Sequence, residues 1–173
     1  MQKITKAGAL ALLAGLITAC GSSSDSEDSG GSIKLDTYAV QSTAGTLSNG
    51  SPIIDTAIGN GEFTIHWEVS GVDSYTMEVY LSDDGSIATT PNLKLYGMNC
   101  GSSGIFSCGM SQDLSCQFGT DGYMSCDPSS IANPPINAGQ YLNYLPRGAY
   151  FVLRVCNALA SECKEEFRYA YIQ

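Results

Sequence analysis

Hydrophobic and polar residues alternate with a period of two over much of the chain after residue 33. One apolar row consists of Phe63, Ile65, Trp67 and Val69, and a second consists of Tyr75, Met77, Val79 and Leu81. Because successive side chains of a β-strand point to opposite faces, each row predicts a half-buried strand. The segment 71–73 between the rows predicts a turn that joins the two strands in a hairpin, and the turn residues 83–85 end the second strand.

A further pair of strands is predicted near the end of the chain, at 149–156 and 163–172, joined by residues 157–162. The first of these segments is apolar on both faces apart from Arg154, which is typical of a strand in the middle of a sheet and leaves its inward face open. In the second, Phe167, Tyr169 and Tyr171 share one face.

Helical periodicity is almost absent after residue 33, so we expect an all-β fold. Residues 33–173 make up about 140 residues, enough for one domain with a substantial hydrophobic core.

The strand that bears Trp67, the Tyr-rich strand after it and the segment 145–152 resemble a fibronectin type III or immunoglobulin-like domain. In such domains a tryptophan packs between two antiparallel sheets, and a tyrosine follows the corner that leads into the penultimate strand. The matching residues are Trp67 and Tyr150. The resemblance implies an antiparallel β-sandwich, with a jelly roll or a small barrel as alternatives. It fails in 97–144, which we interpret as a loop-rich, disulfide-bonded insertion.

The first 32 residues have the organisation of an export signal followed by a linker. Lys3 and Lys6 precede a short apolar stretch, and the run Leu16-Ile17-Thr18-Ala19-Cys20 resembles the lipobox of bacterial lipoproteins. The stretch is shorter than the roughly 20 apolar residues that a membrane-spanning helix needs. The resemblance implies a signal peptide over 1–19, a diacylglycerol thioether on Cys20, and an acylated amine with palmitate as the expected acyl group. An ordinary cleaved signal is the alternative.

Residues 20–32 are rich in serine, glycine and acidic residues, and predict a solvated, flexible tether. In the lipoprotein family, an aspartate directly after the lipidated cysteine often signals retention in the inner membrane. Gly21 stands there, so we expect a lipid anchor in the outer membrane, with the side that the domain faces left open.

The other six cysteines are Cys100, Cys108, Cys116, Cys126, Cys156 and Cys163. An even number in an exported chain predicts up to three disulfides, among 15 pairings. Cys156 and Cys163 end the two strands of a predicted hairpin, which favours their pairing. Cys116 and Cys126 flank a turn signal at 119–122, which leaves Cys100 for Cys108; crossed pairing among these four is the alternative.

The charge of the chain excludes several partners. The chain has 8 basic and 17 acidic residues, and loss of Lys3 and Lys6 with the signal leaves 6 against 17, a net charge of −11. Binding to phosphate backbones requires basic clusters, so nucleic acid is not expected as a partner. We expect the membrane to be contacted through the lipid anchor, because this charge does not favour attraction to anionic lipid.

No catalytic constellation stands out, and we expect no metal and no cofactor other than the covalent lipid. His66 is the single histidine, placed on the outward face of its strand, and the cysteine gaps are too wide for a typical zinc site. Asp83 and Asp121 lie in turn signals that lack a calcium-loop pattern. Glu68 and Glu78 could face each other across the predicted hairpin, which would suit glycoside hydrolysis; exposed strand carboxylates are the alternative.

The candidate binding surface is a group of tyrosines in or beside the Cys-rich segment: Tyr96, Tyr123, Tyr141 and Tyr144. Tyrosines on disulfide-fixed loops offer a large contact area at low entropy cost, whereas the alternative is that they cover the ends of the sandwich. We therefore predict a non-enzymatic binding or assembly module whose partner is an envelope protein or a carbohydrate. The alternatives are an envelope hydrolase that uses surface carboxylates and an accessory subunit of an export or adhesion machine.

Overall fold

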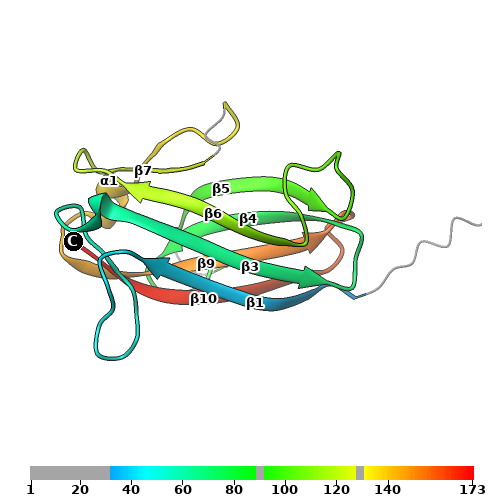
Figure 1. Ribbon diagram of the computed structural model, residues 1–173, viewed down its shortest axis with the longest axis horizontal. Helices are drawn as coiled ribbons and strands as arrows, with labels where there is room; N and C mark the ends of the chain where they lie inside the picture. Colours follow the sequence, from blue (N-terminus) through cyan, green and yellow to red (C-terminus); the bar gives the residue numbers. More distant parts are fainter. Residues whose placement is uncertain (1–31, 89–91, 128–130) are drawn as a thin grey trace, which may run out of the picture.

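Two β-sheets packed face to face form the domain in the computed structural model, which describes residues 32–88, 92–127 and 131–173 (Figure 1). Sheet I contains, in spatial order, β1 (Lys34–Ser42), β3 (Glu62–Ser70), β6 (Ser111–Phe118), β7 (Tyr123–Cys126) and β8 (Ile136–Asn137). Sheet II contains β2 (Ile53–Ile54), β10 (Cys163–Ile172), β9 (Arg147–Asn157), β4 (Ser74–Ser82) and β5 (Asn92–Gly101). Two short helices, η1 (Gly59–Gly61) and α1 (Ala138–Leu142), lie in connections. The expected all-β fold is confirmed.

The core lies between the two sheets and is built from the alternating rows that the sequence predicts. The inward side chains of β3 and β4 are those of Phe63, Ile65, Trp67, Val69, Tyr75, Met77, Val79 and Leu81, and all are buried. Side chains from both sheets meet there: the rings of Phe63 and Phe151 lie 5.1 Å apart between centroids. The Tyr38 hydroxyl crosses the core and donates to the Phe151 carbonyl oxygen at 2.9 Å. Burial raises the pKa of Tyr38, so this donor keeps its proton.

The connection after β3 corrects the expected hairpin. β3 pairs with β1 and β6 in sheet I, whereas β4 pairs with β9 and β5 in sheet II. The turn at 71–73 therefore carries the chain from one sheet to the other. Gly71 makes this crossing with φ of +84°, and a Cβ there would collide with the Ser32 carbonyl oxygen. Only glycine fits both the backbone conformation and the space.

A buried hydrogen-bonded relay connects the two sheets near this crossing. The Trp67 Nε1–H donates to the Tyr75 hydroxyl oxygen at 2.8 Å, and that hydroxyl donates to the Gly109 carbonyl oxygen at 2.8 Å. Trp67 has no exposed surface. The relay satisfies a polar atom on each ring inside the core and ties the loop before β6 to both strands. Trp67 thus packs between the sheets, as the sequence predicts.

β9 is a central strand, as its two apolar faces predict. It pairs with β10 on one side and with β4 on the other. The open question of its inward face is settled by burial: Ala149, Phe151, Leu153 and Val155 contribute to the core cluster. Tyr150 follows the beginning of this penultimate strand but lies on the outer face, where its ring contacts Phe167 and Tyr169 at centroid distances of 5.6 and 5.4 Å.

Segment 97–144 contributes more to the core than an insertion would. It supplies β6, which pairs along seven residues with β3, and it buries Leu114, Phe118 and Met124. β6 has the same period-two pattern as β3, with Cys116 taking an apolar position between Leu114 and Phe118. Cysteine in a disulfide packs as a small apolar side chain, so this strand is less visible in the sequence.

Three disulfides join the pairs that the sequence spacing favours. Cys116 lies opposite Cys126 across the β6–β7 hairpin, and Cys156 lies opposite Cys163 across the β9–β10 hairpin, each with 4.0 Å between Cα atoms. Cys100 and Cys108 are joined at a Cα separation of 4.5 Å. Each bond closes a short loop, so each fixes one local connection.

Candidate binding surfaces

The strands of both sheets run between two ends of the domain. We call the end with Ser32, the β3–β4 turn and the β9–β10 loop the tether pole, because the described chain begins there: the Ser32 hydroxyl donates to Glu162 at 2.6 Å. We call the end with α1, η1 and Gln173 the distal pole. Figure 1 shows these features at opposite ends of the strands.

Large hydrophobic side chains are exposed on the distal pole. Tyr144 is 66% exposed and Ile58 is 61% exposed, and Tyr123 and Leu145 are each 43% exposed. Tyr144 and Leu145 also border a small cavity of about 120 Å³ beside η1, with Phe118 in its wall. Exposed tyrosine and aliphatic side chains next to a cavity are features of recognition surfaces.

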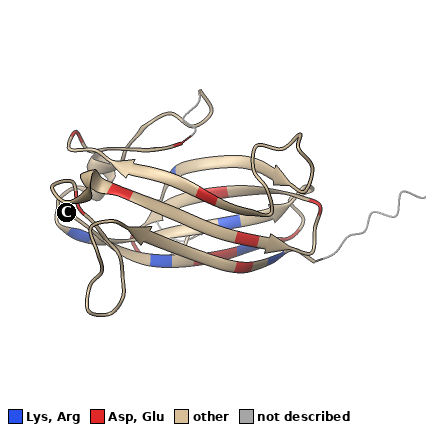
Figure 2. Cartoon of the chain, in the orientation of Figure 1, with Lys and Arg blue, Asp and Glu red and all other residues tan. Residues whose placement is uncertain are grey.

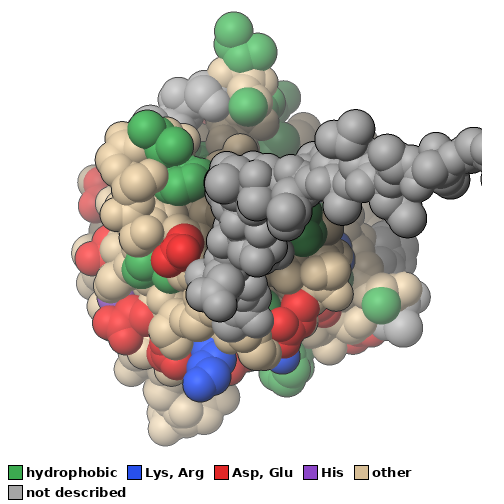
Figure 3. All heavy atoms as spheres, turned by 90° about the vertical axis from the view of Figure 1, so that its right-hand side faces the viewer, with side chains coloured by type: hydrophobic (Ala, Val, Ile, Leu, Met, Phe, Trp, Pro, Cys, Tyr) green, Lys and Arg blue, Asp and Glu red, His purple; other side chains and the backbone are tan. Residues whose placement is uncertain are grey.

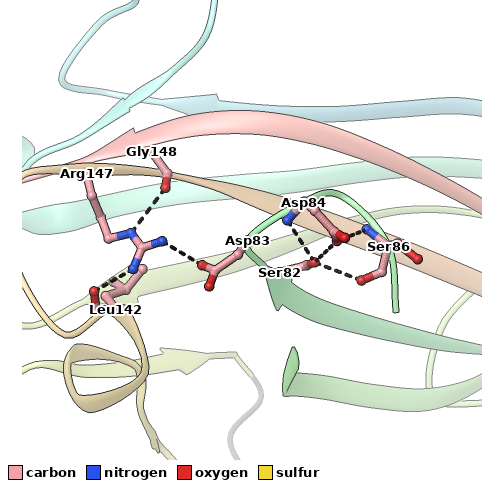
Figure 4. A network of polar contacts seen from close by, with 7 residues as sticks. All are labelled: Ser82, Asp83, Asp84, Ser86, Leu142, Arg147 and Gly148. Atoms are coloured by element: carbon pink, nitrogen blue, oxygen red, sulfur yellow. Dashed lines mark hydrogen bonds and ion pairs between the residues drawn. The ribbon is translucent and has the colours of Figure 1, made fainter. Parts of the chain in front are cut away.

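Arg147 orients Tyr144 at the distal pole, and Figure 4 shows the polar partners that fix the Arg147 guanidinium. Its guanidinium donates to the Leu142 carbonyl oxygen at the end of α1 and to the Asp83 carboxylate, both at 2.7 Å. The same guanidinium lies 5.3 Å from the centre of the Tyr144 ring. A cation over an aromatic face attracts it, so the exposed ring is oriented by a side chain that itself has fixed partners.

Asp55 fixes the loop that presents Ile58. Its carboxylate accepts from the Gln173 side chain at 2.8 Å and from the backbone N–H groups of Ala57 and Ile58 at 2.7 and 3.2 Å. These bonds, the Gln173 bond first, hold the pKa of Asp55 below its usual range. The carboxylate is ionised at neutral pH, and the stabilisation is lost as the pH falls through the lowered pKa.

The structure separates the four tyrosines predicted as one binding surface. Tyr123 and Tyr144 are exposed on the distal pole, and Tyr141 of α1 is partly buried against the core. Tyr96 is 2% exposed, and burial, with the negative charge of Asp127, raises its pKa. It is buried because β5 has a bulge opposite Val79 and Tyr80, which turns two successive side chains, Leu95 and Tyr96, away from water.

The carboxylate pair considered for hydrolysis does not form. Glu68 lies on the outer face of sheet I and Glu78 on the outer face of sheet II, because β3 and β4 are in different sheets. Glu68 accepts from Thr37, and Glu78 is paired with Lys94. The proposal that these two carboxylates face each other is therefore wrong.

His66 lies on the outer face of sheet I, as expected. Its Nδ1 is 2.8 Å from Asp113 and its Nε2 is 3.7 Å from Glu68. Both ring nitrogens thus have carboxylate neighbours. Within residues 32–88, 92–127 and 131–173, no group of three or more His, Cys, Asp and Glu side chains is arranged to hold a metal ion.

The aspartates in turn signals act as turn residues. Asp84 accepts from the Ser86 N–H at 2.9 Å and from the Ser82 hydroxyl at 3.1 Å, and Asp121 accepts from the Tyr123 N–H at 3.0 Å. Asp83 pairs with Arg147 (Figure 4). Such bonds from an aspartate to the backbone two residues on are the usual reason for aspartate in turns.

Charge is distributed unequally between the two sheets (Figure 2). Strands β3, β6 and β7 of sheet I contain no Lys or Arg, whereas β5, β9 and β10 of sheet II carry five basic residues: Lys94, Arg147, Arg154, Lys164 and Arg168. Three of these bases are paired with carboxylates on strands of sheet II. Arg147 is paired with Asp83 just after β4, and Lys164 with Glu162 in the loop before β10. Acidic side chains also outnumber basic ones in the view onto the tether pole (Figure 3).

Sequence reasoning missed a groove on the outer face of sheet I. Its volume is about 560 Å³, and its sides come from β1, β3, β6 and β7. Its outward side chains are hydroxyls, amides and carboxylates: Gln41, Thr64, Ser115, Gln117 and Ser125, with Glu62 and Asp127. The polar positions of the alternating pattern indicate this face, but they do not show that it is hollow.

Two strand edges of sheet II are blocked by side chains and loops. The Asn133 side chain pairs with both the N–H and the carbonyl of Gly97 on β5, at 2.9 and 2.8 Å, and residues 107 and 108 bond to Asn99 and Gly101. On β10, Lys164, Glu166 and Arg168 occupy inward positions at the edge. Charged residues there oppose pairing with another strand, so these edges do not suit assembly by strand addition.

The predicted signal peptide over 1–19, the predicted lipidation site Cys20 and residues 21–31 of the predicted linker lie outside the described residues. None of the described residues belongs to a helix that is long and apolar enough to cross a membrane.

The chain was compared with protein-family models, with curated proteins and with solved structures, and none of them matches it.

Proposed function

We propose that this chain is a lipid-anchored protein of the cell envelope whose β domain is a non-enzymatic binding module, and that it contacts its partner through the distal pole. The lipobox run that ends at Cys20 supports the anchor. The proposed binding role is supported by the exposed side chains of the distal pole, which are those of Ile58, Tyr123, Tyr144 and Leu145.

The proposed anchor and the proposed surface suit each other in geometry. A flexible coil of 12 residues rich in glycine and serine, as we propose for 21–32, would have a root-mean-square span of about 20 Å. A strand such as β9, with 11 residues, adds roughly 35 Å to this. Attachment beside Ser32 would therefore hold the distal pole on the order of 50 Å from the membrane, where a partner has free access.

The fold is proposed to be of the immunoglobulin-like or fibronectin type III kind. In the strand order of such domains, the first, second and fifth strands share one sheet, and the third, sixth and seventh share the other. The order β1-β3-β6 facing β10-β9-β4-β5 supports this assignment, with β5 as the additional strand beside β4. The β7–β8 ribbon departs from it, because it continues sheet I beyond β6 with strands that follow β6 in the chain.

A position-specific crosslinking experiment tests the binding role. We expect a photoreactive amino acid in place of Tyr144, in cells that make the full chain, to give a discrete crosslinked product on irradiation. The matched control is the same amino acid in place of Leu159, which is 77% exposed at the tether pole. Products of equal yield from both positions, or none from position 144, would contradict the proposal.

The anchor predicts a change of fractionation. Cys20→Ser removes the thiol that lipidation requires, so we expect nearly all of the protein to move from the membrane fraction to the soluble fraction. Several acyl chains at about 0.8 kcal/mol per buried CH₂ make a stable anchor, and nothing replaces them in the variant. Thr18→Ser, which keeps a small residue beside the cleavage point, should leave the protein in the membrane. Retention of the Cys20→Ser protein in membranes would exclude the lipid anchor.

A further inference from the structure

We infer that the polar groove on the outer face of sheet I is a binding site for a neutral oligosaccharide. The inference goes beyond the proposed function, because the groove and the distal pole are different surfaces and either can bind without the other. It rests on four features of the groove: its shape, the chemistry of its side chains, its rigidity and its charge.

The groove is built from neighbouring outward side chains on four adjacent strands. Gln41 of β1 lies opposite Thr64 of β3, and Thr64 lies opposite Ser115 of β6. A second row runs beside it, in which Gln117 of β6 lies opposite Ser125 of β7. Its volume of about 560 Å³ is within the range of small-ligand sites.

These side chains leave hydrogen-bonding capacity for a ligand. Among the described residues, the side chains of Gln41, Thr64, Ser115 and Ser125 form no hydrogen bond to another group. Hydroxyl and amide groups both donate and accept, and so do the hydroxyls of a sugar. A row of such groups at the spacing of adjacent strands can therefore exchange several hydrogen bonds with consecutive sugar units.

Bonds within the protein fix the shape of the groove before a ligand binds. The disulfide between Cys116 and Cys126 lies beneath it and joins β6 to β7. At its end, Gly61 passes so close to Phe118 that a Cβ would collide with the Phe118 carbonyl oxygen, and Gln117 donates to the Asn60 carbonyl oxygen at 3.0 Å. Preorganised groups lose little entropy on binding, which favours a shallow polar site.

The charge of this face selects against anions. The strands β3, β6 and β7 carry no Lys or Arg, and the groove contains Glu62 and Asp127 (Figure 2). A phosphate or uronate group would meet these carboxylates with no cation to compensate. The chemistry thus favours a neutral glycan over an acidic one.

Binding of defined oligosaccharides tests the inference. The full protein, extracted in a detergent without a sugar headgroup, is titrated calorimetrically with neutral hexasaccharides of glucose, mannose and N-acetylglucosamine, and with hexagalacturonate as the acidic probe. We expect saturable binding of at least one neutral hexasaccharide and at least tenfold weaker binding of hexagalacturonate. Thr64→Val with Ser115→Ala removes two hydroxyls with little change in shape, and should weaken binding at least tenfold.

The control is Ser111→Ala, on the same strand and face as Ser115 but outside the groove, which should change affinity less than twofold. Far-ultraviolet circular dichroism of each variant shows whether it is folded. The inference is overturned if no neutral hexasaccharide binds at millimolar concentration, if hexagalacturonate binds as tightly, or if the double variant binds as well as the original. Crosslinking at Tyr144 is unaffected by any of these results, so the two proposals fail separately.

Discussion

Trp67→Ala is expected to lower the free energy of unfolding by about 4 kcal/mol, which is a large part of the stability of a domain of this size. Trp67 has no exposed surface and lies between the sheets, so its removal leaves a cavity that the surrounding strands cannot close. The Tyr75 hydroxyl also loses the donor that bonds to it. The measurement is urea unfolding followed by circular dichroism, and we expect the midpoint to fall while the slope is unchanged.

The matched control for this variant is His66→Ala. His66 is the preceding residue on the same strand, but its side chain points outward and its partners are exposed carboxylates. Exposed ion pairs contribute little, so we expect a change of less than about 1 kcal/mol. If the two variants lose equal stability, the inward face of β3 has been assigned incorrectly.

Reduction of all three disulfides is expected to remove about 7.5 kcal/mol of stability. The bonds span 8, 10 and 7 residues in sequence, and closure of loops of this size contributes about 2.5 kcal/mol each in the chain-entropy model. The sum is comparable with the whole stability of a typical domain. We therefore expect a reducing agent to unfold most of the protein at 37 °C, as measured by circular dichroism and by alkylation of the released thiols.

The three bonds can also be tested singly. Replacing both cysteines of one pair by serine, in three separate variants, should cost about 2.5 kcal/mol in each case. Peptide mapping of the unreduced protein should recover Cys100 with Cys108, Cys116 with Cys126, and Cys156 with Cys163. Crossed pairs in that map, or a reduced protein as stable as the oxidised one, would contradict the local role given to these bonds.

The candidate tyrosines show how far the sequence could predict a surface. Tyr123 and Tyr144 lie next to glycine or in a short connection, and such positions are usually exposed, as they are here. The burial of Tyr96 could not be predicted from the sequence. The β5 bulge adds one residue to the strand, which reverses the alternation of inward and outward side chains and turns Tyr96 into the core. Likewise, Arg147 orients Tyr144 and is itself held by Asp83, which lies 64 residues earlier in the sequence.

The polar groove of sheet I gives a second example. Its hydroxyl and amide residues are visible as the polar half of the alternating pattern in β3 and β6. The alternation predicts that these residues share the outer face of the sheet. It does not predict whether that face is flat or hollow. The hollow lies between β1 on one side and β7 on the other, where β7 is joined to β6 through Cys116 and Cys126.

The sequence alone determined the strands at 63–69 and 75–81 and their inward faces, since side-chain alternation is a local property of the extended chain. It also favoured the cysteine pairs, because each pair closes a short loop. Only the tertiary structure decided which strands are neighbours. The rows of β3 and β4 fit a hairpin in one sheet as well as two strands facing each other across a core, since both arrangements bury the same side chains. The structure has the second arrangement, because β3 pairs with β6 and β4 pairs with β9. This arrangement also determines where Glu68, Glu78, the distal pole and the groove lie.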